Sequence, residues 1–274
     1  MDPIMKWAGG KRKLLSEIKK VINFNELSTH RLFEPFIGGG ALSFDVLNEK
    51  TTINDINPEL INVYIQIRDN PQELIRILKM HKENNTHDYF YMIRNLDRND
   101  SYSLMSNVQK AARTIYLNRV CYNGLYRVNS KGFFNVPYGR YVNPEIVFED
   151  KIYKISSFLK NSKVKITCKD FEEAVKNAKK GDVVYFDPPY DYDDNGFTSY
   201  TKKGFSRNDL KRLKRTCDRL IEKGCHIIVS NNDTSYVNDL FSDSKYKFNH
   251  IYATRMINCD GKKRKSVKEV IIYG

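Results

Sequence analysis

The stretch that decides the fold is VVYFDPPY, residues 183–190, in which an apolar run is followed at once by a rigid polar turn. The apolar run indicates a buried strand, and ligands of open α/β sheets bind beyond the carboxyl ends of such strands. Two prolines fix the backbone of the turn, remove two N–H donors and extend the residue before them. The turn therefore offers acceptors, the Asp187 carboxylate and the Pro188 carbonyl, beside the ring of Tyr190.

These groups suit one chemical problem. The exocyclic amino group of adenine is a poor nucleophile, because its lone pair is delocalised into the ring. Two acceptors that hold its two N–H bonds would draw the lone pair out of conjugation and stabilise the positive charge that develops on nitrogen. An aromatic face would stack on the base once the base has left the duplex. Asp187, Pro188, Pro189 and Tyr190 thus form a candidate catalytic site, with a plain surface turn as the alternative.

Short apolar runs on both sides of this turn predict further strands, and helical patterns alternate with them. The predicted strands are residues 31–36, 51–54, 164–167 and 225–229, and the predicted helices are residues 14–22, 58–68 and 210–222. The last helix has clear boundaries, because Ser206 can cap its start with Asp209 three residues on, and Gly224 follows its end. The alternation predicts an α/β fold with a mostly parallel sheet.

The middle of the chain breaks this rhythm. From Pro71 to about Tyr122 the pattern is helical, and residues 122–141 are then rich in Asn, Gly, Tyr and Arg without a clear period. One helical side carries Val108, Ala111, Ala112, Ile115 and Leu117. We expect residues 58–162 to be an insertion into an α/β domain formed by residues 1–57 and 163–274.

A glycine-rich turn and an acidic residue follow two other strands. The sequence FEPFIGGG at 33–40 lets the backbone approach a ligand closely, although such a turn also suits any tight strand-to-helix connection. Asp55 ends the next strand, at a place where an acidic residue commonly holds a ribose diol. It is also a candidate N-cap for the helix that begins at Pro58, and it could serve both roles. Together the two strand ends favour a nucleoside ligand.

Composition limits the class of protein. A formal charge of +13 and a pI of about 9.3 are typical of a protein that binds a polyanion, or of a lysine-rich proteome. No apolar run approaches the length that spans a bilayer, and the N-terminus lacks the apolar stretch of a secretory signal, so we expect a cytoplasmic protein without membrane contacts. The five cysteines contain no C-x-x-C pair, which argues against a disulfide framework or a zinc site.

Taken in order, the motifs resemble the Dam family of DNA adenine methyltransferases (D12 class, α group), most closely the DpnM-type methylases of GATC-specific restriction–modification systems. They are KWAGGK at 6–11, FEPFIGGGA at 33–41, NDIN at 54–57, YNGLYRVNSKG at 122–132, NVPYGRY at 135–141 and DPPY at 187–190. The resemblance runs from residue 6 to residue 273. It implies a Rossmann-like class I methyltransferase sheet with an inserted, mainly helical target-recognition domain and a β-hairpin loop.

The resemblance also implies an activity. A methyl group would pass from S-adenosyl-L-methionine to N6 of a flipped-out adenine of double-stranded DNA, within GATC, leaving S-adenosyl-L-homocysteine and requiring no metal. A monomer, associated with the nucleoid through its DNA, and a paired restriction endonuclease are further expectations. The residues that match the family's cofactor site are Trp7, Lys11, Phe36, Gly38, Gly39, Gly40, Asp55, Asp170, Phe171 and Asp187. Core packing is the alternative for Trp7, and a solvated side chain is the alternative for Lys11.

A second set of residues matches the family's DNA contacts: Lys6, Tyr122, Asn123, Leu125, Arg127, Pro137, Arg140 and Tyr141. Arg127 could grip a guanine edge with two hydrogen bonds. The segment at 122–123 would fill the space left by the extruded adenine, and Leu125, Pro137 and Tyr141 would touch inner bases. Lys6 and Arg140 are expected on phosphates or flanking bases. A packed hairpin is the alternative for the whole stretch 122–141.

Two segments have no clear place in this scheme. Residues 191–199 form an acidic stretch that we expect to cover the site, although negative charge next to DNA has no evident use. The basic run at 262–265 is expected to be a solvated hairpin tip.

Two other functions compete with methylation of DNA adenine. One is methylation of RNA adenine or of a protein amide, for which N-P-P-Y is typical, and the other is that of a DNA-binding module without catalysis. The intact acceptor and cofactor positions argue against the module.

Overall fold

The computed structural model describes residues 3–7, 12–22, 24–161, 163–191, 205–254 and 266–274. Within these ranges one sheet has the strand order β3-β2-β1-β4-β5-β7-β6. Its strands are β1 (Leu32–Glu34), β2 (Thr51–Asn54), β3 (Lys165–Thr167), β4 (Val183–Phe186), β5 (His226–Asn232), β6 (Lys247–Thr254) and β7 (Ser266–Tyr273). The first five strands are parallel, whereas β7 is antiparallel to both β5 and β6. This mixed α/β arrangement is consistent with a class I methyltransferase fold.

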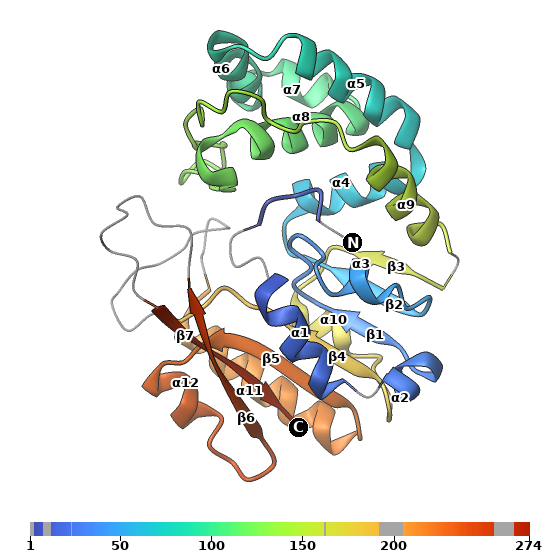
Figure 1. Ribbon diagram of the computed structural model, residues 1–274, viewed down its shortest axis with the longest axis vertical. Helices are drawn as coiled ribbons and strands as arrows, with labels where there is room; N and C mark the ends of the chain where they lie inside the picture. The colour runs from blue at the N-terminus through green and yellow to red at the C-terminus, as the bar shows by residue number, and fades with distance from the viewer. Residues whose placement is uncertain (1–2, 8–11, 23, 162, 192–204, 255–265) are drawn as a thin grey trace.

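The five predicted strands are confirmed, with small shifts at their ends. The strand predicted at 31–36 is shorter, because Pro35 has no N–H with which to continue a ladder. Strands β6 and β7 were not among the predicted strands; they form the antiparallel edge of the sheet, beyond β5 (Figure 1). Lys11, residues 192–199 and the basic run at 262–265 lie outside the described residues, so their expected roles stay predictions.

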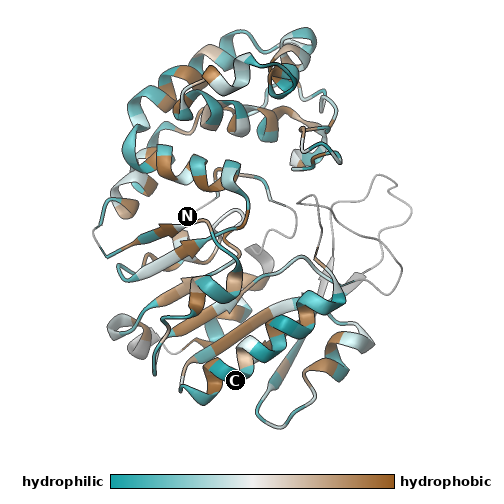
Figure 2. Ribbon diagram, turned by 180° about the vertical axis from the view of Figure 1, so that it is seen from behind, coloured by the Kyte–Doolittle hydropathy of each residue, from teal (hydrophilic) through white to brown (hydrophobic). Residues whose placement is uncertain are grey.

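Alternate residues of the central strands face opposite layers. Val183 and Tyr185 of β4 pack with helix α1 (Arg12–Val21), whereas Val184 and Phe186 pack on the other face. The helices of that second layer are α10 (Phe171–Val175), α11 (Arg207–Glu222) and α12 (Ser235–Leu240). Figure 2 shows the apolar strands between these layers. The period of two in the strands therefore fixes which helices cover which face.

Helix α11 begins and ends where the sequence predicts. Ser206 and Asp209 form a reciprocal capping box at its start, and Gly224 follows its end with a φ of +79°. The prediction that Asp55 caps the helix at Pro58 is wrong. Asn57 is the N-cap instead, because its side-chain oxygen accepts from the N–H groups of Glu59 and Leu60. This leaves the Asp55 carboxylate for another role.

The chain between β2 and β3 is mainly helical, as predicted. Its helices are α4 (Pro58–Asp69), α5 (Pro71–Glu83), α6 (His87–Asn95), α7 (Ser101–Leu104), α8 (Asn107–Val120) and α9 (Glu149–Leu159). Figure 1 shows α5 to α8 gathered at one end of the molecule, with α4 and α9 between them and the sheet. One apolar cluster joins α4, α5, α6, α8 and α9 to Ile53 of β2 and to Ile4 and Met5, so this helical segment packs onto the sheet.

The predicted apolar side of α8 is largely confirmed. Ala111, Ala112, Ile115 and Leu117 are buried, and Val108, the fifth predicted residue, is half-buried against the same cluster. Three short helices, α2 (Phe24–Thr29), α3 (Ser43–Val46) and the 3-10 turn η2 (Tyr122–Gly124), complete the connections used below. Among the helices of the described ranges, none is long and apolar enough to cross a membrane.

Candidate functional site

The candidate site lies at the carboxyl ends of three neighbouring strands, β2, β1 and β4. Asn54 connects the ends of β1, β2 and β3, since its buried amide donates to the carbonyls of Pro35 (3.0 Å) and Lys169 (2.9 Å). Its side-chain oxygen accepts from the N–H of Lys169 at 2.9 Å, and its backbone carbonyl accepts from the N–H of Ile37 at 2.8 Å. One polar side chain thus fixes the loops after β1, β2 and β3 relative to one another.

Asp55 is turned into this edge. Its carboxylate accepts hydrogen bonds from the backbone N–H groups of Asn57 (3.0 Å) and Gly38 (3.3 Å), and the residue is buried. Burial raises the pKa of the Asp55 carboxyl to about 6, which is a moderate shift because the backbone N–H groups favour the ionised form. A buried carboxylate beside a glycine turn is well placed to accept the hydroxyl groups of a ribose.

The glycine turn is closely packed. Gly38 and Gly40 have φ values of +46° and +72°, which favour glycine. A Cβ at Gly38 would lie 2.8 Å from Cδ1 of Trp7, and one at Gly40 would lie 2.2 Å from Cε2 of Phe44. The buried hydroxyl of Tyr64, on α4, donates to the Gly38 carbonyl at 2.6 Å. The turn therefore has a fixed shape, to which Tyr64 contributes from within the helical segment.

Aromatic rings line the next part of the edge. The ring of Phe36 stacks on that of Phe171 at 5.5 Å between centroids and meets the edges of Phe186 and Phe205. Phe171 is the first residue of α10, and Asp170 is the N-cap of that helix. The Asp170 carboxylate also accepts from Arg212 at 2.9 Å. Phe36 and Phe171 thus contact each other, while the carboxylate of Asp170 has structural partners of its own; that the two rings share one ligand stays a prediction.

The Asp187 carboxylate is oriented by a neighbouring strand. Ser230 of β5 donates from Oγ to Oδ1 of Asp187 at 2.9 Å, and the Ser230 hydroxyl lies 3.0 Å from that of Tyr185. The register of β4 on β5 pairs Phe186 with Val229, so Ser230 falls opposite Asp187. Ser230 and Tyr185 were not among the predicted site residues. Their contribution follows from this register rather than from any local motif.

A second carboxyl stands behind Asp187. Glu34 accepts from the N–H of Ser43 at 3.1 Å and from its hydroxyl, and it is buried. Burial raises the pKa of Glu34 to about 8, so this carboxyl is largely neutral at neutral pH. The charge of Asp187 also acts on Glu34 and raises its pKa further. The two carboxyl groups therefore differ in role. Glu34 accepts hydrogen bonds from Ser43 within the fold, whereas Asp187 follows the end of β4 at the candidate site.

Tyr190 is held at the end of the turn. Its hydroxyl lies 3.5 Å from Oε2 of the buried Glu269 of β7. Burial raises the pKa of the Tyr190 phenol well above its usual range, so the ring stays neutral. Pro188 is buried and Pro189 is half-buried. Strand β7, which the sequence did not predict, thus contributes a partner to the candidate catalytic turn.

The predicted DNA-contact residues after α8 form an irregular loop with two isolated antiparallel bridges, Cys121 with Tyr138 and Val128 with Phe134. Asn123 has a φ of +54° within η2. Half of the eight predicted contacts are exposed, namely Tyr122, Arg127, Pro137 and Arg140, and the others are half-buried. Their exposure leaves the loop able to meet a ligand, which distinguishes it from a fully packed hairpin.

Asn118 connects this loop to the N-terminal segment. The buried Asn118 side chain accepts from the Lys6 N–H (2.8 Å) and donates to the carbonyls of Lys6 (2.7 Å) and Gly124 (3.0 Å). The Lys6 ammonium lies 4.6 Å from the ring centroid of Tyr141, and burial lowers the pKa of Lys6. Trp7 stacks on Tyr126 at 5.2 Å. Trp7 therefore lies between the glycine turn and the loop, and it also packs against the apolar cluster of the helical segment, as the core-packing alternative expects.

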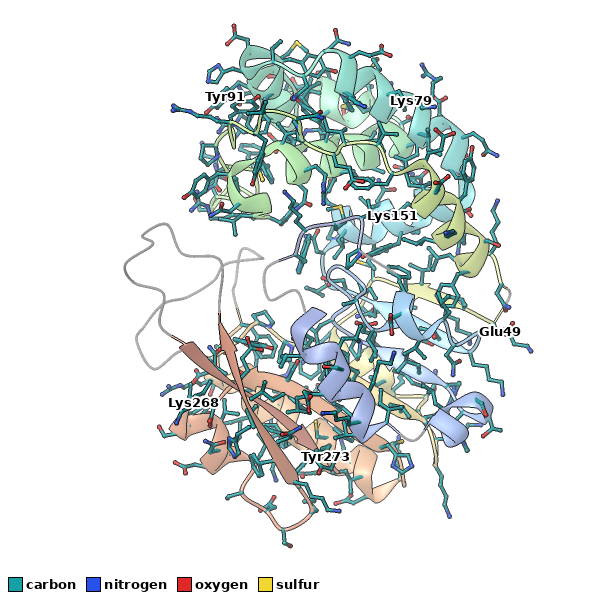
Figure 3. All side chains as sticks on the ribbon, viewed as in Figure 1. Glu49, Lys79, Tyr91, Lys151, Lys268 and Tyr273 are labelled. Atoms are coloured by element: carbon teal, nitrogen blue, oxygen red, sulfur yellow. The ribbon has the colours of Figure 1, made fainter. Side chains whose placement is uncertain are left out.

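Figure 3 shows Tyr91 of α6 and Lys268 of β7 on the same side. The guanidinium of Arg94 lies 4.5 Å from the Tyr91 ring centroid.

Among the described residues there is no cluster of three His, Cys, Asp or Glu side chains that could hold a metal ion.

Comparisons with known proteins cover nearly the whole chain. A family model for D12 class N6 adenine-specific DNA methyltransferases matches residues 7–258. The chain is 46% identical over 278 residues to the type II methyltransferase M1.LlaDCHI of Lactococcus lactis subsp. cremoris, which covers 100% of this chain and 96% of that relative. It is 39% identical over 290 residues to the type II methyltransferase M.MjaIII of Methanocaldococcus jannaschii, with 99% and 98% covered.

A third relative has a different kind of name. The DNA adenine methylase of Haemophilus influenzae is 32% identical over 284 residues, with 99% of this chain and 93% of the relative covered. These matches confirm the family that the ordered motifs predicted. The chain belongs to the D12 class of N6 adenine-specific DNA methyltransferases and is an adenine-specific DNA methyltransferase of the Dam-like group.

Proposed function

We propose that this enzyme methylates N6 of a flipped-out adenine of double-stranded DNA, within GATC, and takes the methyl group from S-adenosyl-L-methionine. The observation that carries the proposal is the meeting of three elements at one sheet edge: the buried Asp55, the glycine turn and the Asp187 turn. A nucleoside donor and a target base placed at this edge would lie side by side.

The residues present fit such a donor. The Asp55 carboxylate would accept the ribose hydroxyls, and the turn at 38–40 would let the ligand approach the backbone. Phe36 and Phe171 offer apolar faces for the donor's adenine, and Trp7 closes the side of the turn. When bound, S-adenosyl-L-methionine supplies an electrophilic methyl group on a positively charged sulfur.

The chain's own groups then prepare the acceptor. The Asp187 carboxylate and the Pro188 carbonyl would each accept one N–H of the target amino group, which aims the lone pair of N6 at the methyl group. The Tyr190 ring would stack on the extruded base. Ser230 keeps the Asp187 carboxylate in one orientation, so little rearrangement is needed as positive charge develops on N6.

Recognition of DNA is assigned to residues 58–162, and above all to the loop after α8. The exposed Arg127 would read a guanine edge, and Tyr122 and Asn123 would fill the space left by the base. The net charge of +13 supports binding to phosphates. Two relatives are named type II methyltransferases, which favours a modification role beside a paired restriction endonuclease. A monomeric enzyme is a separate part of the proposal.

The pH dependence of donor binding tests the role of Asp55. Because burial raises its pKa to about 6, the carboxylate is ionised above that pH and neutral below it. A neutral carboxyl is a poorer acceptor for two hydroxyls, so we expect the Kd for S-adenosyl-L-methionine to rise by about tenfold between roughly pH 7.5 and pH 5. The fluorescence of Trp7, the single tryptophan, measures binding.

Asp55→Asn is the matched variant for this measurement. It should bind the donor more weakly at every pH and show no inflection near pH 6. An inflection of the same size in Asp55→Asn would assign the pH dependence to another group and remove Asp55 from the donor site.

The activity itself is tested with labelled S-adenosyl-L-methionine and two duplexes that differ only in the presence of GATC, followed by digestion to nucleosides. We expect label in N6-methyldeoxyadenosine from the GATC duplex alone. Label from both duplexes would keep the chemistry and contradict GATC as the site. Bound donor without transfer to either duplex would favour RNA as substrate or a DNA-binding protein without catalysis, and label in a protein amide would favour the amide reaction.

A further inference from the structure

Asp191 is an acidic residue that a DNA-facing site does not explain. It follows Tyr190 directly and begins the acidic stretch whose charge had no evident use. Its side chain is only 8% exposed, so it does not extend toward a bound duplex. Its partners lie 16 to 43 residues further along the chain, on β5 and at the starts of α11 and α12.

The backbone of Asp191 is held by β5. Its N–H donates to Oδ1 of Asn231 at 3.0 Å, and its carbonyl accepts from Nδ2 of Asn232 at 2.5 Å. Both asparagines are buried. Since Ser230 already holds Asp187, three consecutive residues of β5 hold the first residue of the catalytic turn and the residue directly after it. The prolines and Tyr190 lie between these two fixed points.

The side chain of Asp191 is held by two helix starts. Thr234, the N-cap of α12, donates from Oγ1 to Oδ2 of Asp191 at 3.0 Å. Arg207, the first residue of α11, donates from Nε to Oδ1 (3.2 Å) and from Nη2 to Oδ2 (3.3 Å). This is the two-pronged pairing that fixes a carboxylate in direction as well as in position. The Arg207 guanidinium also lies 4.3 Å from the ring centroid of Tyr236.

We propose that Asp191 is a positioning residue for methyl transfer, which fixes the Pro188 carbonyl and the Tyr190 ring relative to the Asp187 carboxylate, and that Arg207 acts through it. The proposal rests on the proposed function, because it takes Asp187, Pro188 and Tyr190 as the groups that hold the target adenine. A displacement of about 1 Å in such groups can lower a rate by about 10²-fold. Asp191 itself touches neither substrate.

Asp191→Asn is the principal variant, because it keeps the shape of the side chain and the backbone contacts to β5 but removes the charge that Arg207 requires. We expect single-turnover methyl transfer to fall by about 10- to 100-fold, while the KM values for donor and duplex and the Tm change little. Arg207→Gln should lower the rate by a smaller factor. The double variant should be no slower than Asp191→Asn alone, since Arg207 has nothing left to act through.

Lys214→Gln is the matched control. Lys214 lies on the same helix, α11, and forms salt bridges with Asp218 and Asp243. The variant therefore removes ion pairs from α11 without removing a contact to Asp191. Its methyl-transfer rate should equal that of the unaltered enzyme. The variants are compared by Tm, by KM for each substrate and by the transfer rate at saturation, so that folding, binding and chemistry are separated.

Several results would overturn the proposal. A rate for Asp191→Asn within twofold of the unaltered enzyme would do so, as would a loss of rate that comes only with a lower Tm. An additive effect of Arg207→Gln in the double variant, together with a raised KM for DNA, would make Arg207 a phosphate contact instead. An unaltered enzyme that transfers no methyl group to either duplex would contradict the proposed function, and the positioning role with it.

Discussion

Asp187→Ala should lower kcat for methyl transfer by about 10³-fold or more, because it removes an acceptor aimed at the charge that develops on the target nitrogen. Each such preorganised hydrogen-bonding group typically contributes about 10² to 10³ in kcat. The carboxylate is held in one orientation by Ser230 at 2.9 Å, so its effect is that of a fixed group. Radiolabel transfer to a GATC duplex, measured in single turnover, gives the rate directly.

Two further variants separate chemistry from folding in this experiment. Asp187→Asn keeps one acceptor oxygen without the charge. We expect its rate of methyl transfer to lie between the rates of the unaltered enzyme and of Asp187→Ala. Asp88→Ala removes a fully exposed carboxylate of α6 and should leave the rate unchanged. If Asp187→Ala keeps near-normal turnover while its Tm is unaltered, the DPPY turn is not the catalytic site.

The parallel part of the sheet could be predicted from the sequence because three of its strands, β1, β4 and β5, are short apolar runs, and two shorter segments with β-branched residues, β2 and β3, fit the alternation with helices. Helix α11 was bounded correctly since its capping box and the glycine after it are local signals. Strands β6 and β7 carry no such signal: they are paired by an antiparallel ladder whose partners lie up to 26 residues apart, and β5 must be in place to bury them. Their existence depends on tertiary context more than on local pattern.

The candidate site was predicted only as far as its motifs extend. A motif states which chemical groups stand at a strand end, and Asp55, Asp187 and Tyr190 could be named on that ground. The groups that orient them could not, because their contacts depend on register. Ser230 reaches Asp187 across 43 residues of sequence, and Tyr64 reaches Gly38 across 26.

The error at Asp55 has a local cause. Asp55 and Asn57 can both act as N-caps, and the sequence does not decide between two polar residues two positions apart. The structure gives the cap to Asn57, and the N–H of Asn57 itself donates to Asp55. The helix start therefore orients the carboxylate that it does not use as a cap.

Helix α4 was predicted to belong to the recognition insertion. Its Tyr64 nevertheless contacts the glycine turn, because the Tyr64 hydroxyl donates to the Gly38 carbonyl.

Arg127→Ala should reduce discrimination between GATC and a duplex altered at one guanine by about 1–3 kcal/mol, roughly 5- to 150-fold. Arg127 is exposed, and its Nε donates to Oδ1 of Asn135 at 2.8 Å. That contact uses Nε of the guanidinium, so the two terminal nitrogens are the donors that would meet a guanine edge. Two parallel donors on a fixed plane match the two acceptors of a guanine edge. Binding to each duplex, measured by fluorescence anisotropy at one salt concentration, gives the ratio.

Charge and geometry are separated by Arg127→Lys, which keeps the positive charge but loses the paired donors. It should lose discrimination nearly as fully as Arg127→Ala while retaining more affinity for random DNA. Arg140→Ala is the opposite case: if Arg140 contacts a phosphate, binding should weaken equally on all duplexes and the salt dependence should decrease by about one ion. If Arg127→Ala instead weakens binding equally on all duplexes, Arg127 contacts the DNA phosphates. Recognition of that guanine must then come from another residue of the loop.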